Sequence, residues 1–251
     1  MQWLRSLFFN FQMYAMMALM GIAFIPVVFL RKDGAYVALR TYCRYVRWTA
    51  AWIVGLKTEI RGQVPEGELL IAAKHQSFLD IIMIVSVIPK PRFVMKQELK
   101  YAPFLGWYAS RIGCVPVDRG KKGKAVQQMV AGVTDPEAPK GQLVIYPQGT
   151  RVAAGAYKSY KIGVGALYAA LEQPVVPAAT NVGVFWRRHG IMRKPGLAVV
   201  EFLPEIPPGR AIGAFMHEVE EHVEAASNRL MVEAGFPEDR LPQGRAIESP
   251  A

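Results

Sequence analysis

His75 and Asp80 are the two residues whose types and spacing could do chemistry. They stand in the segment KHQSFLD (residues 74–80), which follows the apolar run Leu69–Ala73. An aspartate in the first turn of a helix can fold back and accept a proton from one imidazole nitrogen, which leaves the other nitrogen basic. This pairing is typical of hydrolases and transferases. The structural alternative is a capping box, in which Ser77 and Asp80 satisfy the first N–H groups of the helix.

The elements that must position this pair are short strands and helices. The predicted strands are Thr58–Arg61, Leu69–Ala73, Arg92–Met95, Val115–Asp118, Leu143–Tyr146, Val175–Ala179 and Ala198–Phe202. The predicted helices are Phe78–Val87, Ala102–Ile112, Lys124–Gly132, Val164–Leu171 and Gly213–Ala234. Such alternation favours an α/β fold with a central, largely parallel mixed sheet flanked by helices. His75 would then lie at the carboxyl edge of the sheet, where open α/β proteins place their sites.

The first thirty residues form the most apolar part of the chain. No charged residue occurs from Ser6 to Leu30, and about 20 apolar residues suffice for a helix to cross a bilayer core. The run is too long for the apolar region of a signal peptide, and Pro26 is expected to kink it. The helix either crosses the bilayer or dips into one face and returns.

The next segment, residues 35–55, has the pattern of an amphipathic helix. Arg40, Arg44 and Arg47 recur at helical spacing and share one face, opposite an apolar face. The alternatives are a helix on an anionic membrane surface and an ordinary packed helix with a solvated face. Because a segment of membrane-spanning length precedes it, we favour the interfacial helix.

These patterns predict three parts of the chain. Residues 1–56 form N-terminal membrane-associated helices, residues 57–235 form the α/β domain, and residues 236–251 form a mobile C-terminal tail. Arg31 and Lys32 after the apolar run, against Arg5 before it, place the α/β domain on the cytoplasmic side. We therefore expect a protein at the cytoplasmic face of the inner (cell) membrane, either monotopic or single-pass.

The charge balance indicates anionic partners. The chain has 251 residues, a formal charge of +10 and a pI near 9.7, which suits nucleic acid, an acidic membrane or a phosphorylated substrate. No nucleic-acid recognition motif is present, so we expect membrane lipids and no nucleic acid. Two cysteines without a C-x-x-C pair favour neither a disulfide framework nor a zinc site. His217 and His222 are five apart and would not share a metal on a helix.

Four motifs in order, between His75 and Asn181, resemble the glycerolipid acyltransferase family, specifically its lysophosphatidate (1-acylglycerol-3-phosphate) acyltransferases. HQSFLD (75–80) resembles the H-x4-D motif, GCVPVDR (113–119) the second motif, YPQGTR (146–151) the third and VVP (175–177) the fourth. The segments FVMK (93–96) and YAPFLGW (101–107) resemble the region that follows the first motif. The third motif is usually written FPEGTR, so Gln148 stands where the family normally has Glu. An amide keeps the shape of the side chain but loses the charge, and we expect it to hold the geometry of the loop.

The resemblance implies a reaction. A fatty acyl group would pass from acyl-CoA or acyl-carrier protein to the sn-2 hydroxyl of lysophosphatidate, giving phosphatidate for phospholipid biosynthesis. His75 would be the general base, oriented by Asp80. No cofactor beyond the acyl co-substrate is expected. Because the thioester is already activated and the chain has no G-x-S-x-G segment, we expect direct transfer without an acyl-enzyme.

The resemblance also implies a set of binding residues. Arginine pairs two phosphate oxygens and stays charged, so the phosphate of the acceptor is assigned to arginines and to the turn beside one of them. The residues predicted to bind phosphate are Arg119, Arg151, Gly149 and Thr150. Possible further substrate-binding residues are Lys96, Gln148 and Lys161. No metal site is predicted.

Two other functions stay open. The same chemistry could act on another lysolipid acceptor, such as a lyso-ornithine lipid. A non-catalytic membrane module that binds anionic lipid would use the same charge and apolar segment, and His75 would then be dispensable. His189 lies in a basic Trp-Arg-Arg-His loop (186–189) that could face lipid headgroups.

Overall fold

A mostly parallel sheet organises the computed structural model, which describes residues 1–118 and 122–242. Within these residues the strands follow the order β1-β7-β6-β2-β5-β3-β4, and each neighbouring pair is parallel except β6 with β7. The strands are β1 (Leu56–Arg61), β2 (Leu69–Ala73), β3 (Pro91–Lys96), β4 (Val115–Val117), β5 (Gln142–Ile145), β6 (Val175–Thr180) and β7 (Gly196–Phe202). The predicted α/β fold and its predicted strands are confirmed.

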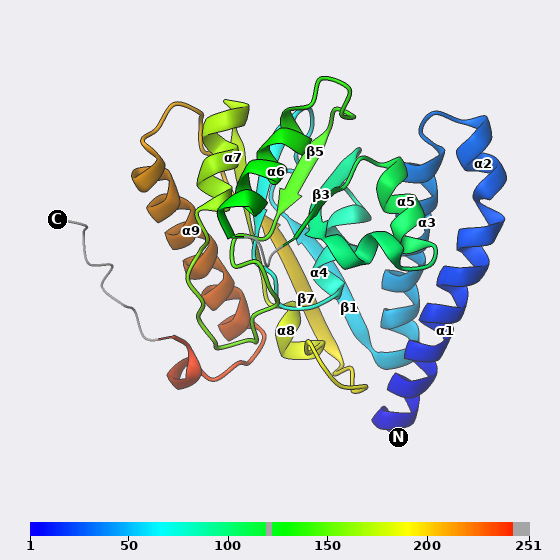
Figure 1. Ribbon diagram of the computed structural model, residues 1–251. Helices are drawn as coiled ribbons and strands as arrows, with labels where there is room; N and C mark the ends of the chain where they lie inside the picture. Colours follow the sequence, from blue (N-terminus) through cyan, green and yellow to red (C-terminus); the bar gives the residue numbers. More distant parts are fainter. Residues whose placement is uncertain (119–121, 243–251) are drawn as a thin grey trace.

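Helices cover both faces of this sheet (Figure 1). The first group is α1 (Gln2–Ala23), α2 (Ile25–Leu30), α3 (Gly34–Thr49) with the π-helical turn η1 (Ala50–Val54), α4 (Leu79–Val85), the 3-10 turn η2 (Gln97–Tyr101) and α5 (Leu105–Arg111). The second group is α6 (Lys122–Thr134), α7 (Gly163–Leu171), α9 (Ile212–Glu233) and the 3-10 turn η4 (Glu238–Arg240). The short helix α8 (Val182–Phe185) packs in the core of the first group. Each predicted helix has a counterpart. The one predicted from Ala102 begins later, at Leu105, because Pro103 and the left-handed φ of 59° at Phe104 interrupt it.

The two helical layers bury opposite sides of each central strand. Leu70 and Ala72 of β2 pack in the core beneath α6, α7 and α9, whereas Ile71 and Ala73 pack in the core shared with α3 and α4. Because both faces of β2 are buried, its sequence is apolar throughout instead of alternating. That continuity makes this strand recognisable in the sequence.

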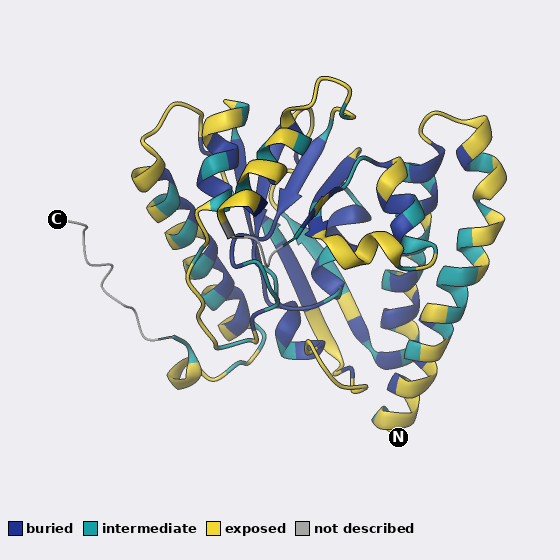
Figure 2. Cartoon of the chain, viewed as in Figure 1, coloured by how far each residue is buried: buried dark blue, intermediate teal, exposed yellow. Residues whose placement is uncertain are grey.

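The N-terminal helices α1, α2 and α3 pack side by side against the α4 and α5 face (Figure 1). The first helix ends at Ala23, three residues before Pro26, and α2 begins at Ile25. The apolar run is therefore interrupted near Pro26, where a kink was expected. By length and composition α1 could cross a membrane, with 22 residues and a mean hydropathy of 1.3. Its outward side is exposed (Figure 2). The exposed large apolar residues of α1 include Leu4, Phe8, Phe11, Leu19 and Ile22.

The basic stripe of α3 contacts the rest of the protein, although Arg44 remains exposed, and the interfacial position of this helix stays a prediction. Arg40 donates to Pro89 O at 2.6 Å, Arg44 donates to Ser86 O at 3.2 Å, and Arg47 donates to Ser86 Oγ at 2.7 Å. These acceptors lie at and beyond the C-terminal end of α4, where helix carbonyls are unpaired and the helix dipole favours cations. The three arginines therefore fasten α3 to α4.

The C-terminal segment is folded over its first part. Phe236, where the predicted tail begins, packs against Gly155, and η4 follows it. The predicted mobile tail therefore does not include residues 236–242, and residues 243–251 lie outside the described residues.

Candidate active site

Five parallel strands end at one edge of the sheet and bring the motifs together. His75 follows β2 and Tyr146 follows β5, and these two strands are direct neighbours in the sheet. Lys96 ends β3 on the other side of β5. The loop of residues 146–151 is joined to the loop of His75, since Val152 N–H donates to His75 O at 2.8 Å. The sheet order therefore explains why motifs about 70 residues apart in sequence meet in space.

His75 and Asp80 form a hydrogen-bonded pair. His75 Nδ1 lies 2.8 Å from Asp80 Oδ1, so Nδ1 carries the proton and Nε2 is left as the acceptor. The His75 side chain is 12% exposed and that of Asp80 1%. Solvent and substrate can therefore reach the imidazole, whereas the carboxylate is shielded behind it.

The Asp80 carboxylate also fixes the start of α4. Its Oδ2 accepts hydrogen bonds from Gln76 N–H at 2.9 Å and Ser77 N–H at 2.8 Å. Ser77 Oγ in turn accepts from Leu79 N–H at 3.3 Å. Asp80 therefore makes the bonds expected for both of its predicted roles. One oxygen orients His75, and the other accepts the N–H groups of Gln76 and Ser77 at the start of the helix.

The ring of Tyr146 holds the imidazole from one side. The two rings are stacked with their centroids 3.9 Å apart and their planes at 20°. Burial, together with the charge of Asp80, raises the pKa of the Tyr146 hydroxyl well above its usual value. The hydroxyl therefore stays protonated near neutral pH, and the contribution of this residue to His75 is the packing of its ring.

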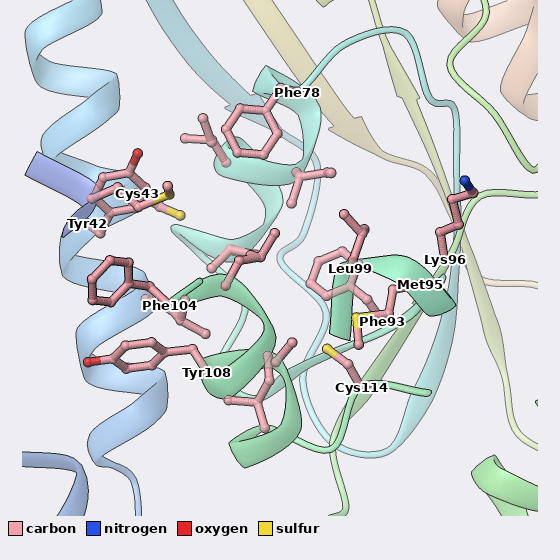
Figure 3. A pocket seen from close by; sticks show the side chains of 18 of the residues that line it. Tyr42, Cys43, Phe78, Phe93, Met95, Lys96, Leu99, Phe104, Tyr108 and Cys114 are labelled. Atoms are coloured by element: carbon pink, nitrogen blue, oxygen red, sulfur yellow. The ribbon is translucent and has the colours of Figure 1, made fainter. Parts of the chain in front are cut away.

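A cavity of about 470 Å³ opens beside His75, within the range expected for a ligand pocket. Tyr42 and Cys43 of α3 face Phe93 and Met95 of β3 across it, and Phe104 and Tyr108 of the α5 region close another side (Figure 3). The apolar helix α1 supplies one wall through Met17, Met20 and Gly21. This cavity can accommodate a long apolar chain whose reactive end lies at the imidazole.

Both cysteines of the chain line this cavity. Burial raises the pKa of the Cys43 thiol and of the Cys114 thiol to about 12. The nucleophilic form of cysteine is the thiolate, and at neutral pH both groups remain thiols. Neither is therefore suited to form a covalent acyl intermediate.

The turn of the third motif presents Thr150 and Arg151 to the cavity. Gly149 has a left-handed φ of +67°, and its N–H donates to Tyr146 O at 2.8 Å, so this amide serves the turn. Lys161 lies against the turn, since a Cβ at Gly149 would be 3.1 Å from Lys161 Nζ. Thr150 and Arg151 follow the turn and line the cavity.

Gln148 points away from the cavity into a buried polar network. Its Nε2 donates to Lys158 O at 3.0 Å and to Glu224 Oε1 at 3.3 Å. Glu224 comes from α9 and also pairs with Lys74 at 2.6 Å. Gln148 is not among the described residues that line the cavity. Its geometry therefore agrees with a loop-holding residue and not with the substrate contact that was predicted as an alternative.

The remaining predicted residues differ in position. Lys96 lines the cavity, but its amino group turns away from the other labelled side chains (Figure 3) and lies 2.7 Å from Glu98. Arg119 lies outside the described residues. His217 and His222 are both exposed on α9. Within the described ranges no three His, Cys, Asp or Glu side chains gather as metal ligands would.

Sequence reasoning missed two residues of this region. Arg188 lines the cavity and donates from Nη1 to Arg151 O at 3.4 Å, although it belongs to no motif. Glu224, which pairs with Lys74, lies 150 positions away from it in the chain. One signal for Glu224 was present, since a lysine directly after a fully apolar strand requires a buried anion.

Comparisons with known proteins show the family of the chain. Residues 56–181, which run from β1 to the end of β6 and contain the four motifs, match the family model described as Acyltransferase. The chain therefore belongs to the acyltransferase family.

Several relatives share one name. The chain is 28% identical over 219 residues to the 1-acyl-sn-glycerol-3-phosphate acyltransferase of Pseudomonas aeruginosa, covering 86% of this chain and 84% of that protein. It is 30% identical over 134 residues to the protein of that name from Saccharomyces cerevisiae, covering 51% of this chain and 44% of that protein. Among solved structures, the 1-acyl-sn-glycerophosphate acyltransferase PlsC of Thermotoga maritima superposes with a TM-score of 0.75 at 18% identity. That match covers 90% of this chain and 96% of the other and supports the fold.

Proposed function

We propose that this acyltransferase moves a fatty acyl group from acyl-CoA or acyl-carrier protein to the sn-2 hydroxyl of lysophosphatidate, giving phosphatidate for phospholipid biosynthesis. The observation that carries the proposal is that one cavity is lined by an imidazole, a guanidinium group and a long apolar wall. The imidazole can deprotonate the acceptor hydroxyl, the guanidinium group can bind a phosphate, and the apolar wall can hold an acyl chain. The names of the relatives point to the same acceptor.

His75 is the general base of the proposed reaction. Its Nε2 takes the proton of the acceptor hydroxyl as the oxygen attacks the thioester carbonyl carbon. The tetrahedral intermediate then collapses, the carbon–sulfur bond breaks, and the thiol leaves with the proton returned by His75. A positioned base of this kind accelerates a reaction by roughly 10²–10⁴-fold. Asp80 holds the imidazole in the required tautomer and stabilises its cationic form.

Direct transfer is favoured over an acyl-enzyme. Cys43 and Cys114 line the cavity as protonated thiols, and Ser77 is buried, with its Oγ engaged at the start of α4. The hydroxyl of the acceptor can therefore attack the donor without a covalent relay on the chain.

A phosphate-bearing acceptor is favoured over a phosphate-free one. The cavity is lined by Arg151, whose fork matches a phosphate group bidentately. A lyso-ornithine lipid offers no phosphate for this group. A non-catalytic lipid-binding module would have no use for an imidazole oriented by a buried carboxylate.

A monotopic position at the cytoplasmic face of the inner (cell) membrane is part of the proposal. Near one end of α1, Gln2 Nε2 donates to Arg193 O at 2.8 Å, and near the other end Tyr108 OH donates to Gly21 O at 2.9 Å. These bonds support a helix that lies along the α/β domain over one that leaves it to cross a bilayer. Its exposed apolar side would enter one leaflet.

Acyl transfer by purified membranes tests the proposal. Membranes containing the wild type and radiolabelled acyl-CoA should convert lysophosphatidate into labelled phosphatidate, and His75→Ala should abolish this turnover. His217→Ala, on the exposed face of α9, is the matched control and should behave like the wild type. Absence of phosphatidate with lysophosphatidate, but product with another lysolipid, would reject this acceptor. Unchanged turnover in His75→Ala would reject the mechanism.

A further inference from the structure

We infer that Arg188 is a second phosphate-binding residue, which forms with Arg151 a two-arginine clamp at the cavity that holds His75. This inference rests on the proposed function and adds a residue from outside the family motifs. The loop that carries it, residues 186–193 between α8 and β7, is called the clamp loop below. The ligand is a phosphate group carried by the acceptor or by the acyl donor.

Arg188 is exposed and lines the cavity that holds His75. Arg188 and His189 line the same cavity as His75, Thr150 and Arg151. The guanidinium of Arg188 donates from Nη1 to the main-chain oxygen of Arg151 at 3.4 Å. Because this bond uses one of five N–H groups, the fork retains donors for an anion beside the turn of the third motif.

The electrostatics of the cavity favour an anion. None of the described residues that line it carries a carboxylate. Within the part of the chain that the structure describes, neither Arg151 nor Arg188 has a carboxylate within the 4.0 Å that defines an ion pair. Other arginines of the protein do have such partners, for example Arg229, which lies 2.6 Å from Glu201. Two guanidinium groups that line one cavity without a carboxylate give it a positive potential, which a bound phosphate would neutralise.

The clamp loop is held in place at its base. Trp186 and Arg193 form an isolated β-bridge, and the Arg193 guanidinium lies 4.3 Å from the centre of the Trp186 ring. The helix α1 adds further bonds, since Ser6 Oγ accepts from Arg193 N–H at 3.0 Å and Asn10 Nδ2 donates to Ile191 O at 2.9 Å. A side chain on a loop fixed in this way loses less freedom when it binds a ligand.

The chemistry of the pair identifies the ligand class. Two guanidinium forks can surround the oxygens of a phosphate monoester, which carries close to two negative charges at neutral pH. Lysophosphatidate carries such a group, and acyl-CoA carries both a monoester and a pyrophosphate. The shared ligand is therefore a phosphate group, and kinetics with each substrate distinguishes the two sources.

The test compares Arg188→Ala with two other variants of the full-length protein. Arg188→Lys keeps the charge but loses the fork, and Arg187→Ala removes an exposed arginine of the same loop that is not among the described cavity-lining residues. The kcat and KM are measured for lysophosphatidate at saturating acyl-CoA, and for acyl-CoA at saturating lysophosphatidate. Hydrogen bonds to charged groups predict a rise in KM of about 10- to 100-fold in Arg188→Ala. The kcat should stay within about twofold of the wild type, Arg188→Lys should be intermediate, and Arg187→Ala should equal the wild type.

The measured KM values decide whether Arg188 binds phosphate and which substrate carries that phosphate. A rise in KM for lysophosphatidate alone assigns the clamp to the acceptor, and a rise for acyl-CoA alone assigns it to the donor. Unchanged KM values for both substrates overturn the inference while the proposed function stands. Calorimetric titration of inorganic phosphate provides a readout without turnover. If the wild type transfers no acyl group, weaker phosphate binding by Arg188→Ala but not by Arg187→Ala still supports the clamp, and equal binding by the wild type and Arg188→Ala overturns it.

Discussion

Lys74, the residue before His75, forms a buried ion pair with Glu224 of α9, and its Nζ lies 2.6 Å from both carboxylate oxygens. The Lys74 side chain is 1% exposed and that of Glu224 15%. The pair joins the end of β2 to a helix on the face of the sheet opposite to the cavity. A structural charge pair thus adjoins the proposed catalytic base without lining the cavity, where substrate would bind.

Glu224→Gln should destabilise the protein, because it leaves the Lys74 ammonium buried without its counterion. Breaking a buried pair in this way costs roughly 3–5 kcal/mol, which would be measured as the free energy of unfolding in urea. Glu218→Gln is the matched control, since Glu218 pairs with Arg210 at the more exposed end of the same helix. Exposed pairs contribute at most about 1 kcal/mol. Equal losses in both variants would contradict the importance of the buried pair.

The defect of Glu224→Gln should also depend on pH. Burial lowers the pKa of the Lys74 ammonium, an effect that Glu224 opposes. Between this lowered value and the ordinary lysine pKa of about 10.4, the unfolded chain binds more protons than the folded one, so stability rises with pH in that window. Without Glu224 the window extends closer to neutral pH. The difference in unfolding free energy between variant and wild type should therefore be smaller at pH 9 than at pH 7, and a constant difference would contradict this account.

Gln148→Glu should lower stability although it restores the residue usual in the family motif. The new carboxylate would face Glu224 and the carbonyl of Lys158, both of which now accept hydrogen bonds from the Gln148 amide. A buried acceptor left without a donor costs about 1–3 kcal/mol. The double variant Gln148→Glu/Glu224→Gln again contains one carboxylate and one amide, so a double-mutant cycle in urea should show recovery of part of the loss. Strict additivity of the two changes would show that these side chains are not coupled.

Asp80→Asn should reduce kcat and leave KM for lysophosphatidate nearly unchanged. An amide can occupy the same space, but it does not favour the His75 tautomer with a proton on Nδ1 or stabilise the imidazolium. Loss of the orienting carboxylate in a comparable pair reduces kcat by up to about 10⁴-fold, and we expect a loss of about 10²-fold or more. Steady-state kinetics at pH 7 decides this, with circular dichroism as a check that the cap of α4 survives. A kcat within a few-fold of the wild type would exclude Asp80 as the orienting group.

Tyr146→Phe should have little effect on turnover, whereas Tyr146→Ala should be strongly impaired. The stacking of this ring on His75 is retained by phenylalanine, and the raised pKa of the hydroxyl removes it as a proton carrier near neutral pH. Values of kcat/KM for the two variants test this difference. A large loss in Tyr146→Phe would show that the hydroxyl itself takes part.

The sequence predicted those features that depend on neighbouring residues in the chain. The strands were recognisable because burial on both faces gives continuous apolar runs, as in Leu69–Ala73. The pairing of His75 with Asp80 was recognisable because they are five residues apart, and an aspartate in the first turn of α4 can fold back to a histidine just before the helix. The sequence did not reveal what the arginines of α3 contact (Arg40, Arg44 and Arg47). Spacing along a helix shows which residues share a face, but it does not show which part of the protein that face packs against.

Contacts between residues far apart in the chain could not be predicted from the sequence either. Lys74 and Glu224 meet through the packing of α9 on the sheet, and Arg188 reaches the cavity through the fold of a loop without a motif. Neither Glu224 nor Arg188 lies in a periodic pattern that would distinguish it from a solvated charge, and Lys74 signals that a buried anion is needed but not which residue supplies it. Only the three-dimensional arrangement of the sheet and its helices identifies them.

The first helix is structurally inseparable from the rest of the protein. Met17, Met20 and Gly21 line the cavity, and Ser6 and Asn10 bond to the clamp loop. Removing an apolar leader is a common way to obtain a protein that behaves well without detergent. Here such a truncation would open the cavity beside His75 to water and release the clamp loop that carries Arg188. The shortened protein would therefore lose activity even if it were more soluble.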